Sequence, residues 1–248
     1  MKKFIVSLII TFIAGISTLI GGLIPFLKIK NKERIILSSL AFASGIMISI
    51  SLLDLLPSSF NYLFNIYGLI FSLFFIIIFI FIGVATFFVF DKFLKKDVDN
   101  LYRVGLFSMI AIIIHNIPEG IITFILSAND VRLGLFLGIS IALHNIPEGI
   151  SVMVPVYYGT NNFKKAFLYT LLAGLAEPIG GVIFYLLFKH YISNLMLGFL
   201  FSFIAGVMIY LSLAELIPKS LEYKKNSATL SFFMLGIIFF LIIHIFMH

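Results

Sequence analysis

The stretch His115-Asn-Ile-Pro-Glu-Gly-Ile121 occurs twice in this chain, since His144-Asn-Ile-Pro-Glu-Gly-Ile150 repeats it residue for residue. Each copy lies near the middle of a long apolar segment. A carboxylate at the centre of a bilayer costs roughly 2.5–3.5 kcal/mol on insertion scales. Packing gives no reason to meet that cost twice with the same seven residues. The duplication therefore indicates a bound cation that offsets it.

The composition places these motifs in a membrane. The chain has 248 residues, of which 61% are hydrophobic and 11% are charged, whereas soluble domains carry about 25% charged residues. The net charge of +6 does not indicate a nucleic-acid partner, because the basic residues lie in short loops between apolar runs, where they set membrane topology. The chain has no cysteine, so a bound metal must use oxygen and nitrogen ligands.

We expect one all-α integral membrane domain over residues 1–248, with the lipid bilayer as its surroundings. Open strand edges do not survive in lipid, so every long apolar segment is read as a helix. Eight segments are long enough to cross about 30 Å of hydrocarbon. They are approximately 4–27, 35–57, 67–90, 104–126, 133–156, 166–188, 194–217 and 230–247.

The basic residues predict the orientation. Thirteen of the 17 Lys and Arg residues follow spans one, three, five and seven, and the other four are Lys2, Lys3, Arg132 and Lys189. The positive-inside rule then places both termini outside. A rival interpretation makes the first span a cleaved signal peptide. We disfavour it because that span takes part in an internal repeat.

Two pairs of segments resemble each other. Gly45–Pro57 recurs as Gly206–Pro218, with Gly, Met, Ser, an acid and Pro in the same register. More weakly, Thr18–Gly22 resembles Glu177–Gly181. Five spans separate the partners, so the copies run in opposite directions across the membrane. The spans therefore group as three, a central pair and three inverted, which is typical of secondary transporters with a midplane site.

Helical spacing brings the motif side chains together. In each copy His and Glu are four residues apart and Asn and Glu three apart, so all three share one helix face. Pro118 and Pro147 should bend the helices, and Gly120 and Gly149 let another backbone or an ion approach closely. Glu177, in the next span, adds a third carboxylate. The predicted metal ligands are His115, Asn116, Glu119, His144, Asn145, Glu148 and Glu177.

This ligand set suits zinc, iron, manganese and cobalt equally. Two divalent ions bridged by Glu119 and Glu148 would nearly neutralise three carboxylates, as a low-dielectric setting requires. The alternative is a hydrogen-bonded His–Glu pair that binds no metal. Met47 is either a thioether ligand or a packing residue.

Three further residues lie outside the motifs. Asp54 and Glu215 are placed at opposite mouths of the pathway, as cation contacts or as snorkelling or capping acids. His244 lies near the outer surface outside any motif and is expected to be solvated or interfacial.

The motifs His115-Asn-x-Pro-Glu-Gly120, His144-Asn-x-Pro-Glu-Gly149 and Ala176-Glu-Pro178 resemble the metal-site motifs of the ZIP family of divalent-metal transporters, most closely its bacterial ZupT branch. The resemblance covers nearly the whole chain and implies the 3 + 2 + 3 inverted-repeat fold. It also implies an elevator-like motion, a homodimer and the bacterial cytoplasmic membrane. The chain departs from many relatives because its third loop is not rich in histidine.

The resemblance also implies how a binuclear centre is shared. One metal position would use His115, His144, Glu119 and Glu148. The second would use both glutamates with Asn116, Asn145 and Glu177.

The predicted function is non-ATP import of divalent metal ions, chiefly Zn²⁺ with Fe²⁺, Mn²⁺ and Co²⁺, and no catalytic cofactor is expected. No Gly-x-x-x-x-Gly-Lys loop exists in the sequence, so ATP is not expected to drive it. The alternatives are an intramembrane metalloprotease, whose zinc helix would need His-Glu-x-x-His, and a membrane di-iron oxidase.

Overall fold

The computed structural model describes residues 2–23, 31–93, 100–188 and 193–247, and within these ranges it contains helices and short connections but no strand. The all-helical prediction is confirmed for this part of the chain. The α-helices are α1 (Lys2–Ile16), α2 (Thr18–Gly21), α3 (Lys32–Ile50), α4 (Leu56–Phe93), α5 (Asn100–Asn129), α6 (Val131–Thr160), α7 (Phe163–Phe188), α8 (Asn194–Tyr210), α9 (Ile217–Leu221) and α10 (Asn226–Met247).

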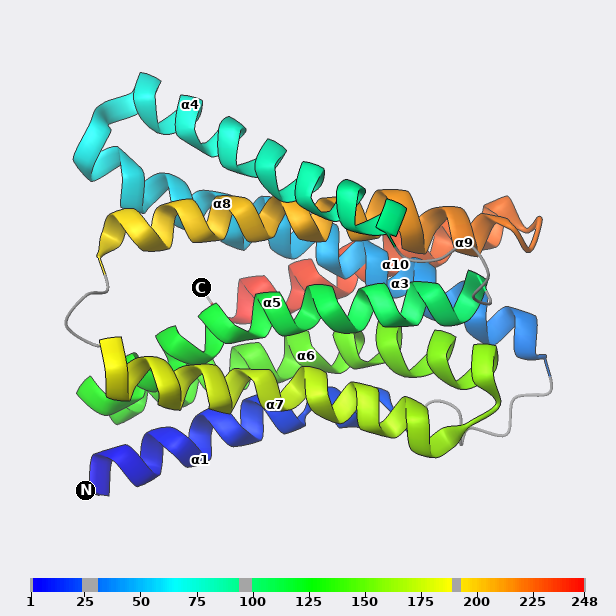
Figure 1. Cartoon of the computed structure of the whole chain (residues 1–248), viewed down its shortest axis with the longest axis horizontal. Coiled ribbons are helices and arrows are strands. Elements are labelled where there is room, and N and C mark those ends of the chain that lie inside the picture. The colour runs from blue at the N-terminus through cyan, green and yellow to red at the C-terminus, as the bar shows by residue number, and fades with distance from the viewer. Residues whose placement is uncertain (1, 24–30, 94–99, 189–192, 248) are drawn as a thin grey trace.

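Seven helical stretches in the described ranges are long and apolar enough to cross a membrane. One of them, Lys32–Val89, has 58 residues, which is about 87 Å of helix at 1.5 Å per residue and nearly three times the hydrocarbon thickness. Within it, Gly68 has φ 70° and ψ −176°, a conformation that glycine adopts without strain. The ribbon of α4 doubles back near its start (Figure 1).

The predicted spans fall within these helices, with two differences. The first span was expected to reach residue 27, but α2 ends at Gly21 and residues 24–30 lie outside the described ranges. The expected connection at 58–66 is helical as far as the break at Gly68. Pro57 does not interrupt it, because the π-helical turn Ser51–Leu55 lies just before this proline and continues the helix across the position where the proline lacks a backbone donor.

The helices pack as two groups. The site-bearing group contains α1, α2, α5, α6 and α7, and the flanking group contains α3, α4, α8, α9 and α10. Within the flanking group α4 lies along α8 and α10 along α3. Figure 1 shows the site-bearing helices in its lower half, with α4 and α8 above them. The groups meet where α6 packs on α3 and α5 packs on α8.

Two π-helical turns interrupt the flanking group at matched places. These are η2 (Ser51–Leu55) and η3 (Leu211–Leu216), and each holds the acid of an acid-x-x-Pro sequence. In each turn a backbone N–H skips to the carbonyl five residues back, from Leu56 to Ser51 and from Ile217 to Ser212. Such turns occur frequently at functional sites.

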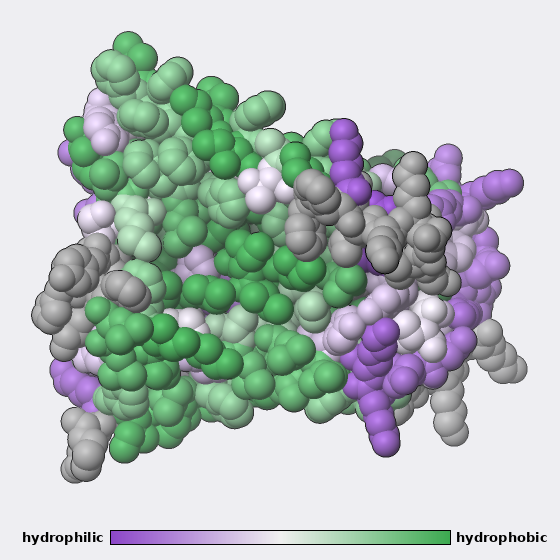
Figure 2. Space-filling model, in the orientation of Figure 1, coloured by the Kyte–Doolittle hydropathy of each residue, from purple (hydrophilic) through white to green (hydrophobic). Residues whose placement is uncertain are grey.

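The surface is apolar around the middle and polar at one end. Figure 2 shows an extensive hydrophobic face, with hydrophilic side chains gathered at the end where α3, α7 and α10 begin. Among the described residues, this end carries Lys32, Arg34, Lys92, Arg103, Lys164, Lys165, Lys219, Lys224 and Lys225. The described chain begins and ends toward the opposite end (Figure 1).

Candidate metal centre

The duplicated motifs lie in the middle of α5 and α6, which continue as helices through Pro118 and Pro147. Their bending at these prolines stays a prediction. His115, Asn116, Asn145, Glu148 and Glu177 are buried without measurable exposure, whereas the Glu119 side chain is 13% exposed. His144 lies in α6, and its side chain is outside the described residues.

The motif glycines bring backbones into contact. A Cβ atom on Gly120 would overlap the carbonyl oxygen of Glu177 in α7, and a Cβ atom on Gly149 would overlap the carbonyl oxygen of Thr18 in α2. Of the two predicted uses of these glycines, close approach of another backbone is confirmed. The approach places Glu177 beside the motif of α5.

The motif asparagines anchor the same helices. Asn116 Nδ2 donates to the carbonyl oxygen of Ala173 at 3.0 Å, and Asn145 Nδ2 donates to that of Ala14 at 2.8 Å. Asn145 Nδ2 also donates to Glu177 Oε2 at 2.8 Å. The asparagine side chains are thereby oriented with their oxygen atoms still available.

The spacing around His115 fits a bound metal. Its Nε2 atom lies 3.2 Å from Glu119 Oε1 and 3.3 Å from Glu148 Oε1. Zinc binds imidazole nitrogen and carboxylate oxygen at about 2.0–2.2 Å, so two ligand atoms on a tetrahedral ion lie about 3.3 Å apart. The two measured separations are therefore close to edges of a zinc tetrahedron.

Several buried polar atoms of the site await a partner. Within the described part of the chain, no hydrogen-bond partner is found for Glu148 Oε2, for Glu177 Oε1, or for the side-chain oxygens of Asn116 and Asn145. Leaving such a group unsatisfied costs about 1–3 kcal/mol. A cation in their midst would satisfy them together.

The described side chains make up only part of the predicted metal-ligand set. Among the described side chains, no three His, Asp or Glu groups surround one point as a complete metal site. The first metal position was predicted to use His144, which stands one turn before Glu148 on α6. The described residues thus bring together His115, Asn116, Glu119, Asn145, Glu148 and Glu177.

One cavity links the centre to Asp54. It has a volume of about 230 Å³, lies between the two helix groups and has Asp54 and Glu119 as its charged lining residues. The other lining residues are Leu55, Ser58, Tyr62, Ile122, Leu126, Leu137, Ile141 and Phe201. Asp54 therefore lines the same cavity as a predicted metal ligand, as its pathway role requires.

His244 was predicted to be solvated or interfacial, and the structure adds a contact that this prediction did not include. Its Nδ1 atom lies 3.1 Å from Asp54 Oδ1, and the two side chains are 26% and 25% exposed. Nothing in the sequence around His244 signals this contact, because it depends on how α10 packs beside η2.

A second polar cavity lies at the basic end. It has a volume of about 220 Å³ and is lined by Arg103, Val104, Ala214, Glu215, Pro218, Lys219 and Glu222. Lys219 Nζ donates to Glu222 Oε2 at 2.6 Å. The lining contains Glu215 but none of the motif residues. The cavity beside Asp54 therefore extends to the predicted metal centre, and the cavity at the basic end does not.

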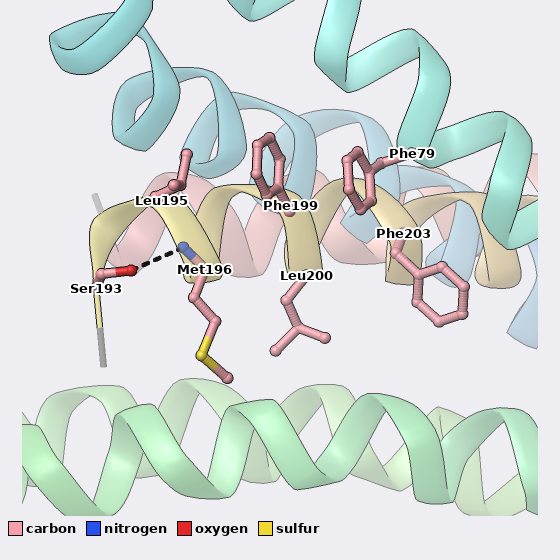
Figure 3. A pocket seen from close by; sticks show the side chains of 7 residues that line it. All are labelled: Phe79, Ser193, Leu195, Met196, Phe199, Leu200 and Phe203. Atoms are coloured by element: carbon pink, nitrogen blue, oxygen red, sulfur yellow. Dashed lines mark hydrogen bonds between the residues drawn. The ribbon is translucent and has the colours of Figure 1, made fainter. Parts of the chain in front are cut away.

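Other hollows and Met47 lie apart from the centre. Met47 is 1% exposed in the apolar core, which favours packing, while its ligand role stays a prediction. An apolar hollow of about 440 Å³ lies along α8, and Figure 3 shows the side chains that line it. The stacked rings of Phe79 and Phe199 have their centroids 4.4 Å apart. The lining of the hollow has no carboxylate or imidazole, so it is not a metal site.

Seven helical stretches of the described chain that are able to cross a membrane, with buried imidazole, amide and carboxylate groups at mid-helix, define the class of polytopic membrane proteins. The sequence model of a family described as "ZIP Zinc transporter" matches residues 95–244. The chain belongs to the ZIP family.

Curated relatives cover nearly the whole chain. The chain is 34% identical to the zinc transporter ZupT of Clostridium perfringens, over 91% of this chain and 90% of that protein. It is 37% identical to zinc transporter ZupT of Streptococcus mutans, over 89% of each chain. For zinc transporter ZupT of Campylobacter jejuni the identity is 35% over 90% of each chain. The predicted resemblance is confirmed.

Proposed function

We propose that this chain is a secondary transporter that imports divalent metal ions, zinc first, through the centre between α5, α6 and α7. The observation that carries the proposal is the placement of His115 Nε2 about 3.2–3.3 Å from carboxylate oxygens of both motif glutamates, inside the protein. Membership of the ZIP family and relatives named zinc transporters support zinc as cargo. The same ligands suit Fe²⁺, Mn²⁺ and Co²⁺.

The centre is binuclear in this proposal. Glu119 and Glu148 bridge two ions, His115 and His144 complete one position, and Asn116, Asn145 and Glu177 complete the other. The unpartnered oxygens of Asn116, Asn145 and Glu177 support the second position. Three carboxylates near two divalent ions leave little net charge, which lowers the electrostatic cost of burial.

The fold of the proposal is an eight-span 3 + 2 + 3 inverted repeat. The reversal at Gly68 supports counting Lys32–Val89 as two crossings. Matched contacts support the repeat, because Ala14 and Ala173 accept the two motif asparagines and stand 159 positions apart, as do Thr18 and Glu177. The two π-turns add a third matched pair.

In this proposal the protein lies in the bacterial cytoplasmic membrane with both termini outside. Hydrophilic side chains gather at one end (Figure 2), where the described basic residues of the loops lie, and this supports an inward-facing basic end by the positive-inside rule. The homodimer remains a prediction of the family resemblance.

The membrane potential supplies a driving force for import. Moving one charge inward gains roughly 2.3 kcal/mol per 100 mV, so a bare divalent ion gains about 4.6 kcal/mol. In this scheme the ion passes Asp54 on its way to Glu119, through the cavity that both line. It leaves past Glu215, which lines the cavity at the basic end.

The enzyme alternatives fit the observations less well. The transporter family favours transport over peptide cleavage or oxygen chemistry. A zinc protease of this kind places a glutamate base next to the first histidine of His-Glu-x-x-His, whereas that neighbour here is Asn116 or Asn145.

Uptake of labelled zinc into proteoliposomes tests the proposal. We expect uptake by the parent protein and its loss in Glu148→Ala and His144→Ala. Glu33→Gln serves as the control, because Glu33 is 63% exposed and lies 3.8 Å from Lys225 at the basic end. Flux at the parent rate in both site variants would overturn the assignment, and absence of flux in the parent would overturn the function.

A further inference from the structure

His244 contacts Asp54, which lines the cavity that also contains Glu119. Asp54 is held in the π-turn η2 and His244 near the end of α10, so both ligand candidates belong to the flanking group. The His244 ring stacks on Phe240, which precedes it by one turn, with centroids 5.5 Å apart and planes at 29°. Phe240 is fully buried, and this packing restrains the orientation of the imidazole.

We propose that Asp54 and His244 form a second divalent-cation site, which captures the ion before it reaches the motif glutamates. The proposal rests on the proposed transport function and assigns that function a ligand pair outside the motifs. Its ligands are one imidazole nitrogen and one carboxylate oxygen, a donor pair typical of zinc. Water completes the coordination.

The measured separation fits a shared ion. Nδ1 of His244 and Oδ1 of Asp54 lie 3.1 Å apart, within a few tenths of an ångström of the roughly 3.3 Å expected across a tetrahedral zinc ion. A small side-chain rotation therefore converts the direct contact into a bridged one. Both side chains are about a quarter exposed, and Asp54 also lines the cavity that contains Glu119, so the pair is not sealed inside the protein.

The surroundings favour a cation that binds briefly and moves on. The described lining of the cavity contains two carboxylates, Asp54 and Glu119, and no Lys or Arg. Carboxylates of one sign along a low-dielectric cleft raise the local concentration of cations. Two protein ligands bind an ion more weakly than the larger central set, which allows the captured ion to be released toward Glu119.

The alternative role of the pair is a structural ion pair that fastens α10 to η2. The two roles respond differently to substitution. His244→Asp keeps a metal-binding group but removes the attraction to Asp54, whereas His244→Lys keeps the attraction but removes a ligand. A capture site therefore tolerates Asp and not Lys, and a structural ion pair shows the reverse.

The first test measures zinc uptake into proteoliposomes as a function of zinc concentration. We expect His244→Lys to raise the apparent KM about tenfold with little change in maximal rate, since the central site is untouched, and His244→Asp to keep a KM near that of the parent. Glu33→Gln, which removes the ion pair with Lys225 outside the cavity, controls for loss of an ion pair. A parent-like KM in His244→Lys, or a KM raised by His244→Asp, would overturn the capture site.

A binding measurement separates failure of this site from failure of the transport function. Detergent-purified Glu148→Ala protein, weakened at the central site, is titrated with Co²⁺ while its visible absorption is recorded. We expect this variant to give a Co²⁺ absorption signal, and we expect the double variant Glu148→Ala/His244→Lys to give none. If the parent takes up no zinc, the transport function fails, and the Co²⁺ titration alone decides the capture site. An identical Co²⁺ signal with and without His244→Lys would reject it.

Discussion

The two copies of the motif have the same seven residues but different surroundings. In both, the asparagine donates to a backbone carbonyl of a neighbouring helix and the glycine lies against a backbone oxygen. The residue that meets Gly120 is Glu177, whereas the residue that meets Gly149 is Thr18. The two copies therefore pack against their neighbouring helices in the same way. They differ in the residue that faces the motif glycine, which carries a carboxylate in one copy and a hydroxyl in the other.

The glutamates of the two copies differ in access. Glu119 is 13% exposed and lines the cavity shared with Asp54, whereas Glu148 is fully buried. Asn145 holds both a backbone carbonyl and Glu177, while the recorded bond of Asn116 goes to a backbone carbonyl alone. Identical motifs therefore supply one accessible carboxylate and one enclosed carboxylate, a difference that would give the proposed centre a direction.

The glycine–backbone contact that both copies of the motif share predicts the largest effect. Gly120→Ala and Gly149→Ala each place a Cβ atom onto a backbone oxygen, and backbone cannot rotate away as a side chain can. We expect each variant to lose about 3 kcal/mol or more of stability, with low yield and a lower Tm in detergent. Leu168→Ala, at a 49% exposed position, is the control. A parent-like Tm in either glycine variant would show that the packing symmetry has been misjudged.

The difference between Glu177 and Thr18, the residues that face the two motif glycines, predicts loss of function with the fold retained. Glu177→Thr gives α7 the residue that α2 has in the matched position, and so removes the third carboxylate. We expect zinc uptake to fall by about 100-fold or more, since even residues that only orient metal ligands cost 10–100-fold. Thr18→Ser is the control, because it keeps the hydroxyl that donates to the Gly15 carbonyl. Equal uptake by Glu177→Thr and the parent would mean that the centre does not depend on α7.

The two motif asparagines also differ, and we expect a smaller effect from their substitution. Asn116→Ala and Asn145→Ala each remove one backbone anchor, so we expect similar decreases in Tm. Asn145→Ala also removes the donor to Glu177, and a hydrogen bond to a charged group is worth about 1.5–3 kcal/mol. Zinc uptake should therefore fall about tenfold further in Asn145→Ala. Equal losses would indicate that Glu177 needs no support from Asn145.

Sequence reasoning reached the helices and the side-chain cluster because both depend on local spacing. The four-residue and three-residue offsets in the motif fix which side chains share a helix face. The mid-span position of the glutamates predicted a cation site without any knowledge of packing. The two uses left open for Gly120 and Gly149 needed coordinates, since only a neighbouring helix shows that a backbone fills the space.

The remaining features depend on tertiary packing that carries no sequence signature. The carbonyls of Ala14 and Ala173 anchor the motifs, but any residue type offers a carbonyl. The Asp54–His244 contact joins segments 190 positions apart. The π-turns had an available signal, the repeated acid-x-x-Pro, because a proline leaves the carbonyl four residues back without its donor.

The difference in access between the two copies predicts a labelling pattern, with the smallest expected effect on activity. The chain has no cysteine, so a single introduced thiol reports on one position. Ser58→Cys places it in the cavity that reaches Glu119, and Ser151→Cys places it on α6, where the native hydroxyl donates to the carbonyl of Glu148. A membrane-impermeant thiol reagent added outside should label Ser58→Cys and leave Ser151→Cys unmodified, because Ser151 is fully buried. Equal labelling would mean that both copies face the same water-filled route, and the directional difference between Glu119 and Glu148 would be lost.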